Sequence, residues 1–448
     1  MSTALIILAA GKGTRMESDL PKVMHELGGA PLFTHAWTHG RALEPTRTVI
    51  VAGHGAELVE KAARDIDPEV TVVVQEEQLG TGHAVLQARA ALEGVEGDAV
   101  VLYGDTPFTG EETLARLVEA RKTADVVVLG FEAADPGRYG RLVMEGNRLA
   151  RIVEFKDASD EERTISLCNS GVVCADAATL MELLDGVNND NAAGEYYLPD
   201  VVAVANARGL TATAVTCDEG ETLGINTRME LVEAERIFQI RARHQAMEDG
   251  ALLQAPDTVH FSADTVIGRD AVVEPNVVFA PGVTVESGAR IRAFSHLEDC
   301  HVSKDAIVGP YARLRPGTEL ANGAKIGNFV EIKNAQIGEG AKVNHLSYVG
   351  DATVGEAANL GAGTITCNYD GVMKHRTTIG ARAFIGSDTM LVAPVTVGDE
   401  AMTTTGAVIT KDVPAGAMAI ARAEQVNKPG LAVKFFARLR ALKAKKGK

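Results

Sequence analysis

Aliphatic side chains recur at every sixth position through the C-terminal half of the chain, and this period restricts the possible folds more than any other feature. The recurring residues are Ile267, Val273, Phe279 (aromatic, but in step), Val285, Ile291, Leu297, Val302, Val308, Leu314, Leu320, Ile326, Ile332, Ile337, Val343, Val349, Val354, Leu360, Ile379, Ile385, Leu391 and Val397. A six-residue period does not suit an α-helix, whose apolar stripe repeats every 3.6 residues. It predicts a parallel β-helix with three flat faces per coil and an inward column of apolar side chains.

Two further features of this half support the β-helix. Gly, Ala, Asn and Pro fill the positions between the aliphatic residues, as tight corners require. The stretch from Ile365 to Thr378 breaks the rhythm and contains Cys-Asn-Tyr-Asp-Gly. Because an interruption in a solenoid generally loops out of one face, where binding often takes place, we predict a functional loop here.

The first half of the chain alternates short β-rich runs with amphipathic stretches. The predicted strands are Ala4–Ala9, Arg47–Ala52, Val70–Val74, Ala99–Tyr103 and Asp125–Gly130, and the predicted helices are Pro31–Arg41, Ala56–Ile66, Gly82–Leu92 and Glu111–Ala124. This alternation, with nearly continuous apolar strands, predicts a parallel sheet covered on both faces. Ligands of such sheets bind at the carboxyl ends of strands, where Gly11–Arg15, Gln75–Thr81 and Gly104–Pro107 lie. A charged stretch from Ile225 to about Asp249 predicts a linker helix.

Composition excludes several classes of protein. The 448 residues include 60 acidic and 44 basic ones, and the net charge of −16 argues against general nucleic-acid binding. No apolar run approaches the roughly 18 residues that a membrane-spanning helix needs. The five cysteines form no C-x-x-C pair and no metal-binding spacing, which favours a reducing cytoplasm. We therefore expect a soluble cytoplasmic protein of several domains that binds neither nucleic acid nor a membrane.

The tail from Leu431 to Lys448 departs from this acidic balance. It contains seven Lys or Arg residues and no acidic residue. Both a solvated end helix and an anion-binding arm fit this pattern, the former being the simpler interpretation.

The loop from Leu8 to Met16 follows the first predicted strand and is rich in glycine. It lacks the Gly-Lys-Ser/Thr of a Walker A loop, and Met16 replaces the third glycine of a dinucleotide fingerprint. The glycines at 11 and 13 would let backbone N–H groups approach phosphate oxygens, while Arg15 and Lys22 could neutralise their charge. On spacing alone, a phosphate-binding role and a structural turn remain equally open.

Three motifs carry a resemblance to a known family. Leu8–Met16, Leu20-Pro-Lys22 and Leu102-Tyr-Gly-Asp105 closely resemble the sugar-1-phosphate nucleotidylyltransferases. With the hexapeptide half, the chain from Ala4 to about Arg422 resembles the bacterial bifunctional enzymes that combine an N-acetylglucosamine-1-phosphate uridylyltransferase with a glucosamine-1-phosphate N-acetyltransferase. This resemblance implies a Rossmann-like uridylyltransferase domain over 1–225, a linker helix over 226–250, a left-handed β-helix acetyltransferase domain over 251–425 and a basic tail over 426–448.

The resemblance also implies two consecutive reactions in the synthesis of UDP-N-acetylglucosamine. The C-terminal half would transfer acetyl from acetyl-CoA to glucosamine-1-phosphate. The N-terminal half would then use UTP and Mg²⁺ to uridylylate the product and release pyrophosphate. The family further implies a cytoplasmic homotrimer with small-molecule substrates, serving cell-wall and lipopolysaccharide synthesis.

Site residues of the N-terminal half follow from the same resemblance. Residues implied to bind the nucleotide and the UDP-sugar are Leu8, Ala9, Ala10, Gly11, Lys22, Gln75, Gly80, Thr81, Tyr103, Gly104, Asp105, Gly140, Glu154, Asn169 and Asn226. Arg15 and Lys22 are implied to act in catalysis, and Asp105 and Asn226 resemble the Mg²⁺ ligands. Gln75 would read the edge of the uracil, because an amide can both donate and accept.

In the C-terminal half, the resemblance makes His345 the general base. Imidazole titrates near neutrality, which suits removal of a proton from the sugar amine. Arg315, Lys333, Tyr348 and Asn359 are implied to bind glucosamine-1-phosphate, and Ala362, Asn368, Tyr369, Ser387, Thr405 and Arg422 to bind acetyl-CoA. The backbone N–H of Ala362 would serve an oxyanion hole. The chain has Thr405 where the family commonly has a small apolar residue.

Two other functions fit parts of the pattern. One is a nucleotidylyltransferase with a single activity and an inert β-helix, against which His345, Arg315 and Lys333 count. The other is a non-catalytic binding subunit, which would have no need for Arg15 and Asp105. The presence of both sets of residues favours the two-activity enzyme.

Overall fold

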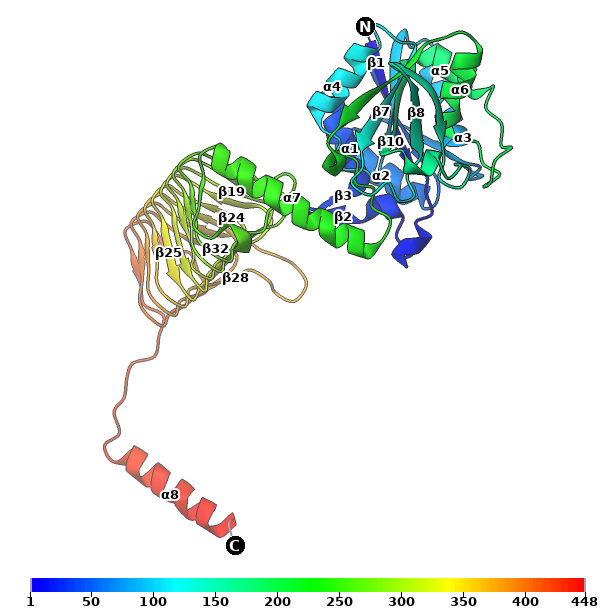
Figure 1. Ribbon diagram of the computed structural model, residues 1–448. Helices are drawn as coiled ribbons and strands as arrows, with labels where there is room; N and C mark the ends of the chain where they lie inside the picture. The colour runs from blue at the N-terminus through cyan, green and yellow to red at the C-terminus, as the bar shows by residue number, and fades with distance from the viewer. Residues whose placement is uncertain (1, 447–448) are drawn as a thin grey trace. The chain divides into compact units, whose positions relative to one another are not determined.

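The computed structural model describes residues 2–446, and the chain divides into two compact units, Met1–Ala242 and Arg243–Lys448 (Figure 1). The long helix α7 (Arg228–Glu248) crosses the boundary between them. It begins and ends within three residues of the predicted linker helix. Each unit has a regular architecture of its own.

The first unit is built on a mainly parallel sheet with the strand order β11-β7-β10-β6-β1-β4-β5. These strands are β1 (Ser2–Ala9), β4 (Arg47–Ala52), β5 (Thr71–Val74), β6 (Gly97–Tyr103), β7 (Val126–Glu132), β10 (Leu167–Asp176) and β11 (Ala212–Cys217). Only β10 runs antiparallel to its neighbours along this path. The hairpin of β8 (Arg141–Glu145) and β9 (Arg148–Val153) joins the sheet through β10, and β2 (Glu26–Leu27) pairs separately with β3 (Ala30–Pro31).

Helices cover both faces of this sheet, as predicted. They are α1 (Leu32–Arg41), α2 (Ala56–Ile66), α3 (Thr81–Leu86), α4 (Glu111–Ala120), α5 (Ala177–Leu184) and α6 (Val201–Ala207). Successive residues of β1 enter two different cores: Ile6 packs with α3, α5 and α6, whereas Ile7 packs with α1, α2 and α4. This is the alternation expected of a central strand buried on both sides.

Two of the predicted helices are shorter in the structure. The helix predicted over Gly82–Leu92 ends as α3 at Leu86, and a separate 3₁₀ turn follows at Ala90–Leu92. The helix predicted over Glu111–Ala124 ends at Ala120, after which backbone N–H groups bond carbonyls three residues back. In both cases the chain tightens before it enters the next strand.

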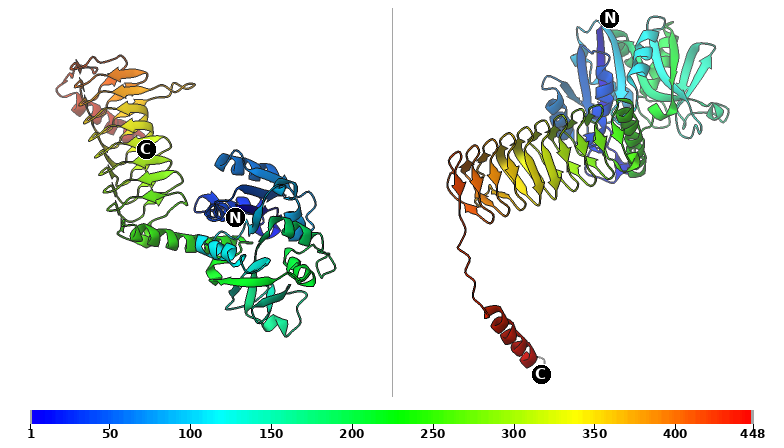
Figure 2. Two further views of the ribbon diagram at one scale, coloured as in Figure 1. Left: turned by 90° about the horizontal axis from the view of Figure 1, so that it is seen from above. Right: turned by 90° about the vertical axis from the view of Figure 1, so that its left-hand side faces the viewer.

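The second unit is a left-handed parallel β-helix with three faces, whose stacked coils are visible in Figure 2. One face contains β12 (Leu252–Leu253), β14 (Val272–Val273), β17 (Arg290–Ile291), β20 (Ile307–Val308), β23 (Lys325–Asn328), β25 (Lys342–His345), β27 (Asn359–Leu360), β30 (Phe384–Ile385), β33 (Met402–Thr403) and β35 (Met418–Ala419). A second contains β15 (Val278–Phe279), β18 (His296–Leu297), β21 (Arg313–Leu314), β28 (Ile365–Cys367), β31 (Met390–Val392) and β34 (Val408–Ile409). The third contains β13 (Val266–Ile267), β16 (Val283–Val285), β19 (Cys300–Val302), β22 (Thr318–Leu320), β29 (Thr377–Ile379) and β32 (Val395–Val397).

Two long strands, β24 (Glu331–Ile337) and β26 (Tyr348–Val354), turn a corner and belong to both the second and the third face. Every residue of the predicted aliphatic column is buried except Ile267, which is half-buried in β13 at the end of its ladder. The six-residue period therefore predicted the core of this unit correctly.

The interruption of the repeat is a loop, as predicted. It spans residues 368–376 between β28 and β29 and projects from the stacked coils (Figure 1). An isolated bridge joins Tyr369 to Lys374 within it.

The basic tail contains helix α8 (Leu431–Lys446), in which every residue is exposed. The solvated end helix predicted for this tail is thus confirmed. Among residues 2–446, no helix is both long and apolar enough to span a membrane.

Two candidate active sites

A cavity of about 270 Å³ opens at the carboxyl ends of β1 and β6 in the first unit. Its wall includes nine of the predicted nucleotide-binding residues: Leu8, Ala10, Gly11, Lys22, Gln75, Gly80, Thr81, Tyr103 and Asp105. The other six predicted residues do not line this cavity: Ala9 is buried in the core, Gly104 packs against Phe33 and Val23, and Gly140, Glu154, Asn169 and Asn226 are described below. The backbone N–H of Gly104 donates to the carbonyl of Leu8 (2.9 Å), which joins the two strand ends.

Sequence reasoning missed four residues of this wall, Val23, Gln78, Ala84 and Glu195. Gln78 donates from Nε2 to the carbonyl of Ala10 (3.0 Å), so the loop after β5 is tied to the glycine-rich loop after β1. The only signal for Gln78 was its place in a loop that follows a strand. Glu195 comes from a distant segment and gave no signal.

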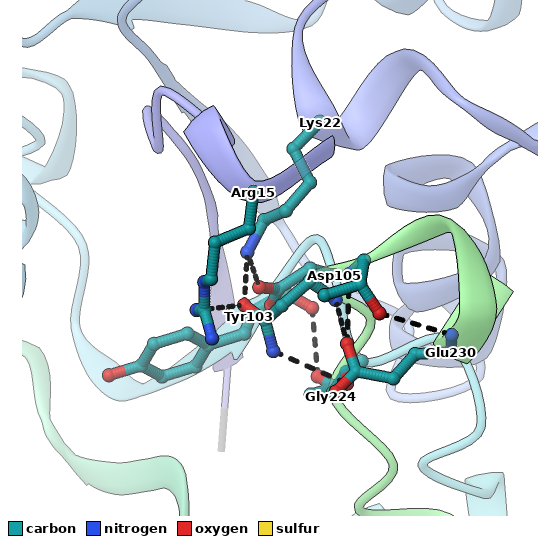
Figure 3. A network of polar contacts seen from close by, with 9 residues as sticks. Arg15, Lys22, Tyr103, Asp105, Gly224 and Glu230 are labelled. Carbon is teal, nitrogen blue, oxygen red and sulfur yellow. Dashed lines mark hydrogen bonds and ion pairs between the residues drawn. The ribbon is translucent and has the colours of Figure 1, made fainter. Parts of the chain in front are cut away.

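Four polar side chains converge at one end of the cavity (Figure 3). The Lys22 ammonium forms an ion pair with the Asp105 carboxylate, and its Nζ also lies 3.1 Å from Oδ1 of Asn226. Arg15 donates from Nη2 to the same amide oxygen (2.9 Å). Asn226 is held in turn by Glu230, whose carboxylate accepts its backbone N–H (2.8 Å). Two oxygen atoms from separate segments thus already face a cation.

This pair of oxygens fits Mg²⁺ better than a transition metal. The part of the chain that the structure describes contains no cluster of three or more His, Cys, Asp or Glu side chains able to hold a metal. Mg²⁺ takes one or two protein oxygens and leaves its other positions to water and phosphates. Asp105 and Asn226, with the Lys22 ammonium between them, provide such a partial site.

A second cavity, of about 370 Å³, lies beside the first and shares Glu195 with it. It is lined by Arg138, Glu154, Phe155, Lys156, Ala193, Glu195 and Tyr197. Glu154 approaches Gly140 so closely that a Cβ on Gly140 would lie 3.0 Å from its Oε1. The carbonyl of Gly140 accepts the backbone N–H of Asn169 (2.9 Å), so these three predicted residues are neighbours.

Carboxylates near this second cavity have unusual titration properties. Burial raises the pKa of Glu154, and the neighbouring Asp200 and Asp157 add to the effect. Burial, together with Asp157, raises the pKa of Asp200 to about 6. Burial also raises the pKa of Tyr103, despite the hydrogen bond between its hydroxyl and Thr81. Burial therefore shifts these acidic groups toward their neutral forms.

In the second unit, His345 lies exposed at the end of β25. Its Nδ1 is 2.8 Å from Oδ1 of Asn328, the residue paired with it one coil earlier. Ser347 donates from its hydroxyl to the carbonyl of His345 (2.8 Å). The imidazole is thus oriented by one side chain and remains accessible.

The second face of the β-helix contains the predicted sugar-phosphate-binding residues Arg315 and Lys333. Arg315 donates to Glu331 (2.8 Å), which is paired in register with Tyr348. Lys333 lies on the same strand as Glu331, and its ammonium group lies near that of Lys374 in the 368–376 loop. This contact lowers the pKa of Lys374, because two ammonium groups repel each other. Lys374 gave no signal in the sequence, because its contact depends on how the loop folds back.

The loop also contacts the predicted sugar site. Asn368 donates from Nδ2 to Asp351 (2.5 Å) and lies 3.4 Å from the hydroxyl of Tyr348. Tyr369 is exposed, and its hydroxyl donates to the carbonyl of Gly371 (2.6 Å).

The remaining predicted residues lie along one corner, above His345. Gly363 donates its backbone N–H to the His345 carbonyl, and Asp388 donates likewise to Ala362 (2.7 Å). In the next coil, Gly406 donates to Ser387 (2.8 Å). Residues 345, 362, 387 and 405 therefore form a column, with Arg422 joined to it by a hydrogen bond to the Thr405 carbonyl (3.2 Å). Asn359 lies just before this corner, on β27.

Comparisons with known proteins give a match to each half of the chain. A MobA-like NTP transferase domain matches residues 5–168, and a bacterial transferase hexapeptide (six repeats) matches residues 264–298. The bifunctional protein GlmU of Jannaschia sp. (strain CCS1) is 68% identical over 445 residues, 99% of this chain and 98% of the relative. That of Ruegeria sp. (strain TM1040) is 69% identical over 448 residues, 100% of both chains.

Among solved structures, a UDP-glucose pyrophosphorylase complexed with UDP-glucose aligns with 54% of this chain and 100% of its own length. The TM-score of 0.45 and the identity of 18% are too low to add to the assignment. The full-length relatives, in contrast, are similar to this chain in both units and at high identity. The chain belongs to the family of the bifunctional protein GlmU.

Proposed function

We propose that the two sites act in sequence on one amino sugar phosphate, with the acetyl group added in the second unit and the uridylyl group in the first. The chain is a bifunctional transferase, a uridylyltransferase joined to an acetyltransferase. The domains proposed for the two reactions are 1–225 and 251–425, joined by 226–250 and followed by a tail over 426–448. The observation that carries the proposal is that each unit brings its own set of reactive side chains together.

In uridylyl transfer, a phosphate oxygen of N-acetylglucosamine-1-phosphate attacks the α-phosphorus of UTP. A new O–P bond forms, and the bond to the leaving pyrophosphate breaks. A phosphate monoester is already a nucleophile near neutral pH, so the protein needs no general base. Its contribution is in-line positioning and neutralisation of charge by Arg15 and Lys22, which lie at one end of the cavity.

Asp105 and Asn226 are the residues we propose to hold Mg²⁺. The ion would neutralise phosphate charge when bound. The carboxylate of Asp105 carries the charge, and Glu230 keeps the Asn226 backbone in place. With Asp105 engaged by the ion, Lys22 would be free to bind phosphate.

Different residues in the walls of the two cavities would bind the uracil base and the sugar. Gln75, Gly80 and Thr81 would hold the uracil, and the backbone of Leu8–Gly11 the ribose and phosphates. Tyr103, Gly140, Glu154 and Asn169 would frame the sugar, as their mutual proximity supports.

In acetyl transfer, we propose that His345 is the general base. Asn328 accepts the Nδ1 proton, so the ring carries its lone pair on Nε2. Nε2 takes a proton from the amine of glucosamine-1-phosphate as the amine nitrogen attacks the thioester carbon. The bond to the CoA sulfur then breaks, and the backbone N–H of Ala362 would stabilise the oxyanion.

Substrate binding in this unit rests on charge and on the corner column. Arg315 and Lys333 would hold the sugar phosphate, and Lys374 adds a third cation beside Lys333. Tyr348 and Asn359 would contact the sugar ring. Asn368, Tyr369, Ser387, Thr405 and Arg422 would bind acetyl-CoA.

We further propose a cytoplasmic homotrimer. The family resemblance implies an acetyl-transfer site between neighbouring chains, and the exposed position of His345 leaves room for a neighbouring chain to complete it. This arrangement would give three acetyl-transfer sites per assembly.

A coupled assay tests the proposal. Purified chain is mixed with glucosamine-1-phosphate, acetyl-CoA, UTP and Mg²⁺, and free CoA and pyrophosphate are followed separately. We expect CoA to appear first and pyrophosphate to depend on it. Pyrophosphate release without N-acetylglucosamine-1-phosphate, or no release of CoA, would contradict the proposed order.

A further inference from the structure

The side chain of Gln75 is only 4% exposed, and both of its amide protons are already engaged. Nε2 lies 3.1 Å from the carbonyl of Gly80 and 3.0 Å from Nδ1 of His83. The amide oxygen has no hydrogen-bond partner within residues 2–446, although Gln75 lines the first cavity. The amide oxygen therefore remains available as an acceptor for a ligand in this cavity.

The Gly80 carbonyl is one of two groups that hold the amide nitrogen of Gln75 toward the protein, and His83 is the other. A backbone carbonyl can only accept, so the nitrogen of Gln75 must point to it. Gly80 itself cannot move or be replaced easily, because its φ is +115° and a Cβ would lie 2.6 Å from the carbonyl of Tyr196. The backbone at Gly80 therefore stays in place, and its carbonyl remains an acceptor for the amide of Gln75.

His83 engages the other amide proton from helix α3. Its Nδ1 must accept, because the nitrogen of Gln75 donates, so a neutral ring carries its proton on Nε2. Gln87 lies beside that Nε2 (3.2 Å) and also donates to the His83 carbonyl (3.0 Å). A neutral ring has a single acceptor, so Gln75 and Gln87 compete for it. Gln75 is buried, whereas the half-buried Gln87 can turn toward water, so the acceptor is assigned to Gln75.

We propose that His83 is a positioning residue, which holds the amide of Gln75 with its oxygen toward the cavity and so makes the site select a base with an N–H at ring position 3. This inference rests on the proposed nucleotidyl transfer in that cavity. Uracil and thymine carry such an N–H, and a carbonyl oxygen accepts it. Cytosine has a lone pair there, which the same oxygen repels.

Loss of the His83 contact leaves the Gly80 carbonyl alone to hold the amide nitrogen, so the amide of Gln75 rotates more readily. A rotated amide offers its N–H to the base and accepts the cytosine ring nitrogen. The predicted effect is therefore on the choice between bases, while the chemistry at the phosphates is unchanged.

Two substitutions separate this role from a structural one. His83→Leu removes the acceptor, whereas His83→Asn can place an amide oxygen where Nδ1 lies. For each variant, kcat/KM is measured with UTP, TTP and CTP, at saturating N-acetylglucosamine-1-phosphate and Mg²⁺. We expect His83→Leu to lower the UTP/CTP ratio about tenfold, the value of roughly one hydrogen bond, and to leave the UTP/TTP ratio unchanged.

His83→Asn should restore most of the UTP/CTP ratio. Gln87→Leu, which alters only the other side of the ring, should keep it. An unchanged UTP/CTP ratio in His83→Leu would overturn the inference, and so would equal losses with all three nucleotides. Lack of uridylyl transfer in the unmodified chain would instead contradict the proposed function.

The tautomer gives a test without substitution. In ¹⁵N-histidine-labelled chain, the resonances lost in His83→Asn identify this ring. We expect the proton on Nε2 and an unprotonated Nδ1. A proton on Nδ1 at neutral pH would overturn the inference, because Gln75 could then not donate to that atom.

Discussion

The Nδ1 atom of His345 lies 2.8 Å from Oδ1 of Asn328, the residue directly below it in the neighbouring coil. The stacking of coils creates this contact, because residues 17 positions apart along the chain fall at the same place in successive turns. It orients the imidazole and determines which nitrogen is free to act as a base.

Asn328→Ala should therefore slow acetyl transfer without weakening acetyl-CoA binding. We expect kcat for CoA release to fall about tenfold, as the loss of one orienting hydrogen bond suggests, with KM for acetyl-CoA unchanged. Asn322→Ala, which changes an exposed asparagine of the same coil, is the matched control and should behave as the unmodified chain. A rise in KM with kcat unchanged would point to a binding role.

The two activities should be separable by single substitutions. Asp105→Ala removes the charged member of the proposed Mg²⁺ pair and should lower uridylyl transfer by about 10²–10³-fold, while acetyl transfer continues. His345→Ala should have the opposite effect. The exposed Asp65 provides a control carboxylate, and Asp65→Ala should alter neither rate. Loss of both activities from either change, in a folded chain, would contradict this division of labour.

Removal of divalent cations should affect only the first unit. We expect EDTA to stop pyrophosphate release and added Mg²⁺ to restore it, because Arg15 and Lys22 alone do not neutralise the triphosphate. CoA release should be the same with and without EDTA. A loss of CoA release would reveal a metal requirement in the β-helix that its side chains do not suggest.

Asp200 should make the first unit less stable as the pH rises. Burial and Asp157 raise its pKa from 3.8 to about 6, so the folded chain favours the protonated form. The corresponding stability is present below about pH 4 and is lost as the pH rises through about 6. Asp200→Asn should therefore raise the free energy of unfolding at pH 7, on the order of 1 kcal/mol because the group is partly solvated.

Urea unfolding at pH 4 and pH 7 measures this effect. The gain from Asp200→Asn should be smaller at pH 4, and Asp157→Asn should give a smaller gain in the same direction at pH 7. An equal gain at both pH values would mean that the substitution acts through packing and not through the charge.

Gly327→Ala should disturb the β-helix beside the acetyl-transfer site. A Cβ at this position would lie 2.0 Å from the carbonyl oxygen of Asn344, which precedes His345. Because backbone atoms must move to admit it, we expect a loss of about 1–3 kcal/mol in stability and a lower rate of CoA release. Pyrophosphate release, measured with N-acetylglucosamine-1-phosphate supplied, should be retained.

Much of the fold could be predicted because it depends on local periodicity. The aliphatic column from Val273 to Val397 is buried as expected, and β4 and α2 have the predicted bounds. The helix ends near Leu86 and Ala120 could not be predicted, because turn formation there depends on the entry into the next strand.

The sites were predictable only where a residue type and its place in a loop carried a signal. Asp105 and Gln75 follow strands, and the cavity confirms that their loops meet. Gln78 had only its place in such a loop, and Glu195 and Lys374 had no signal, since each acquires its neighbours only when distant segments fold together.

By itself, the order of residues determined the two architectures, because the repeat of apolar side chains decides which face of a strand or helix is buried. The tertiary structure alone decided the local chemistry. It brought Lys22, Asp105 and Asn226 together and set His83 against Gln75, and such contacts depend on the path of the backbone between residues, which no local pattern encodes.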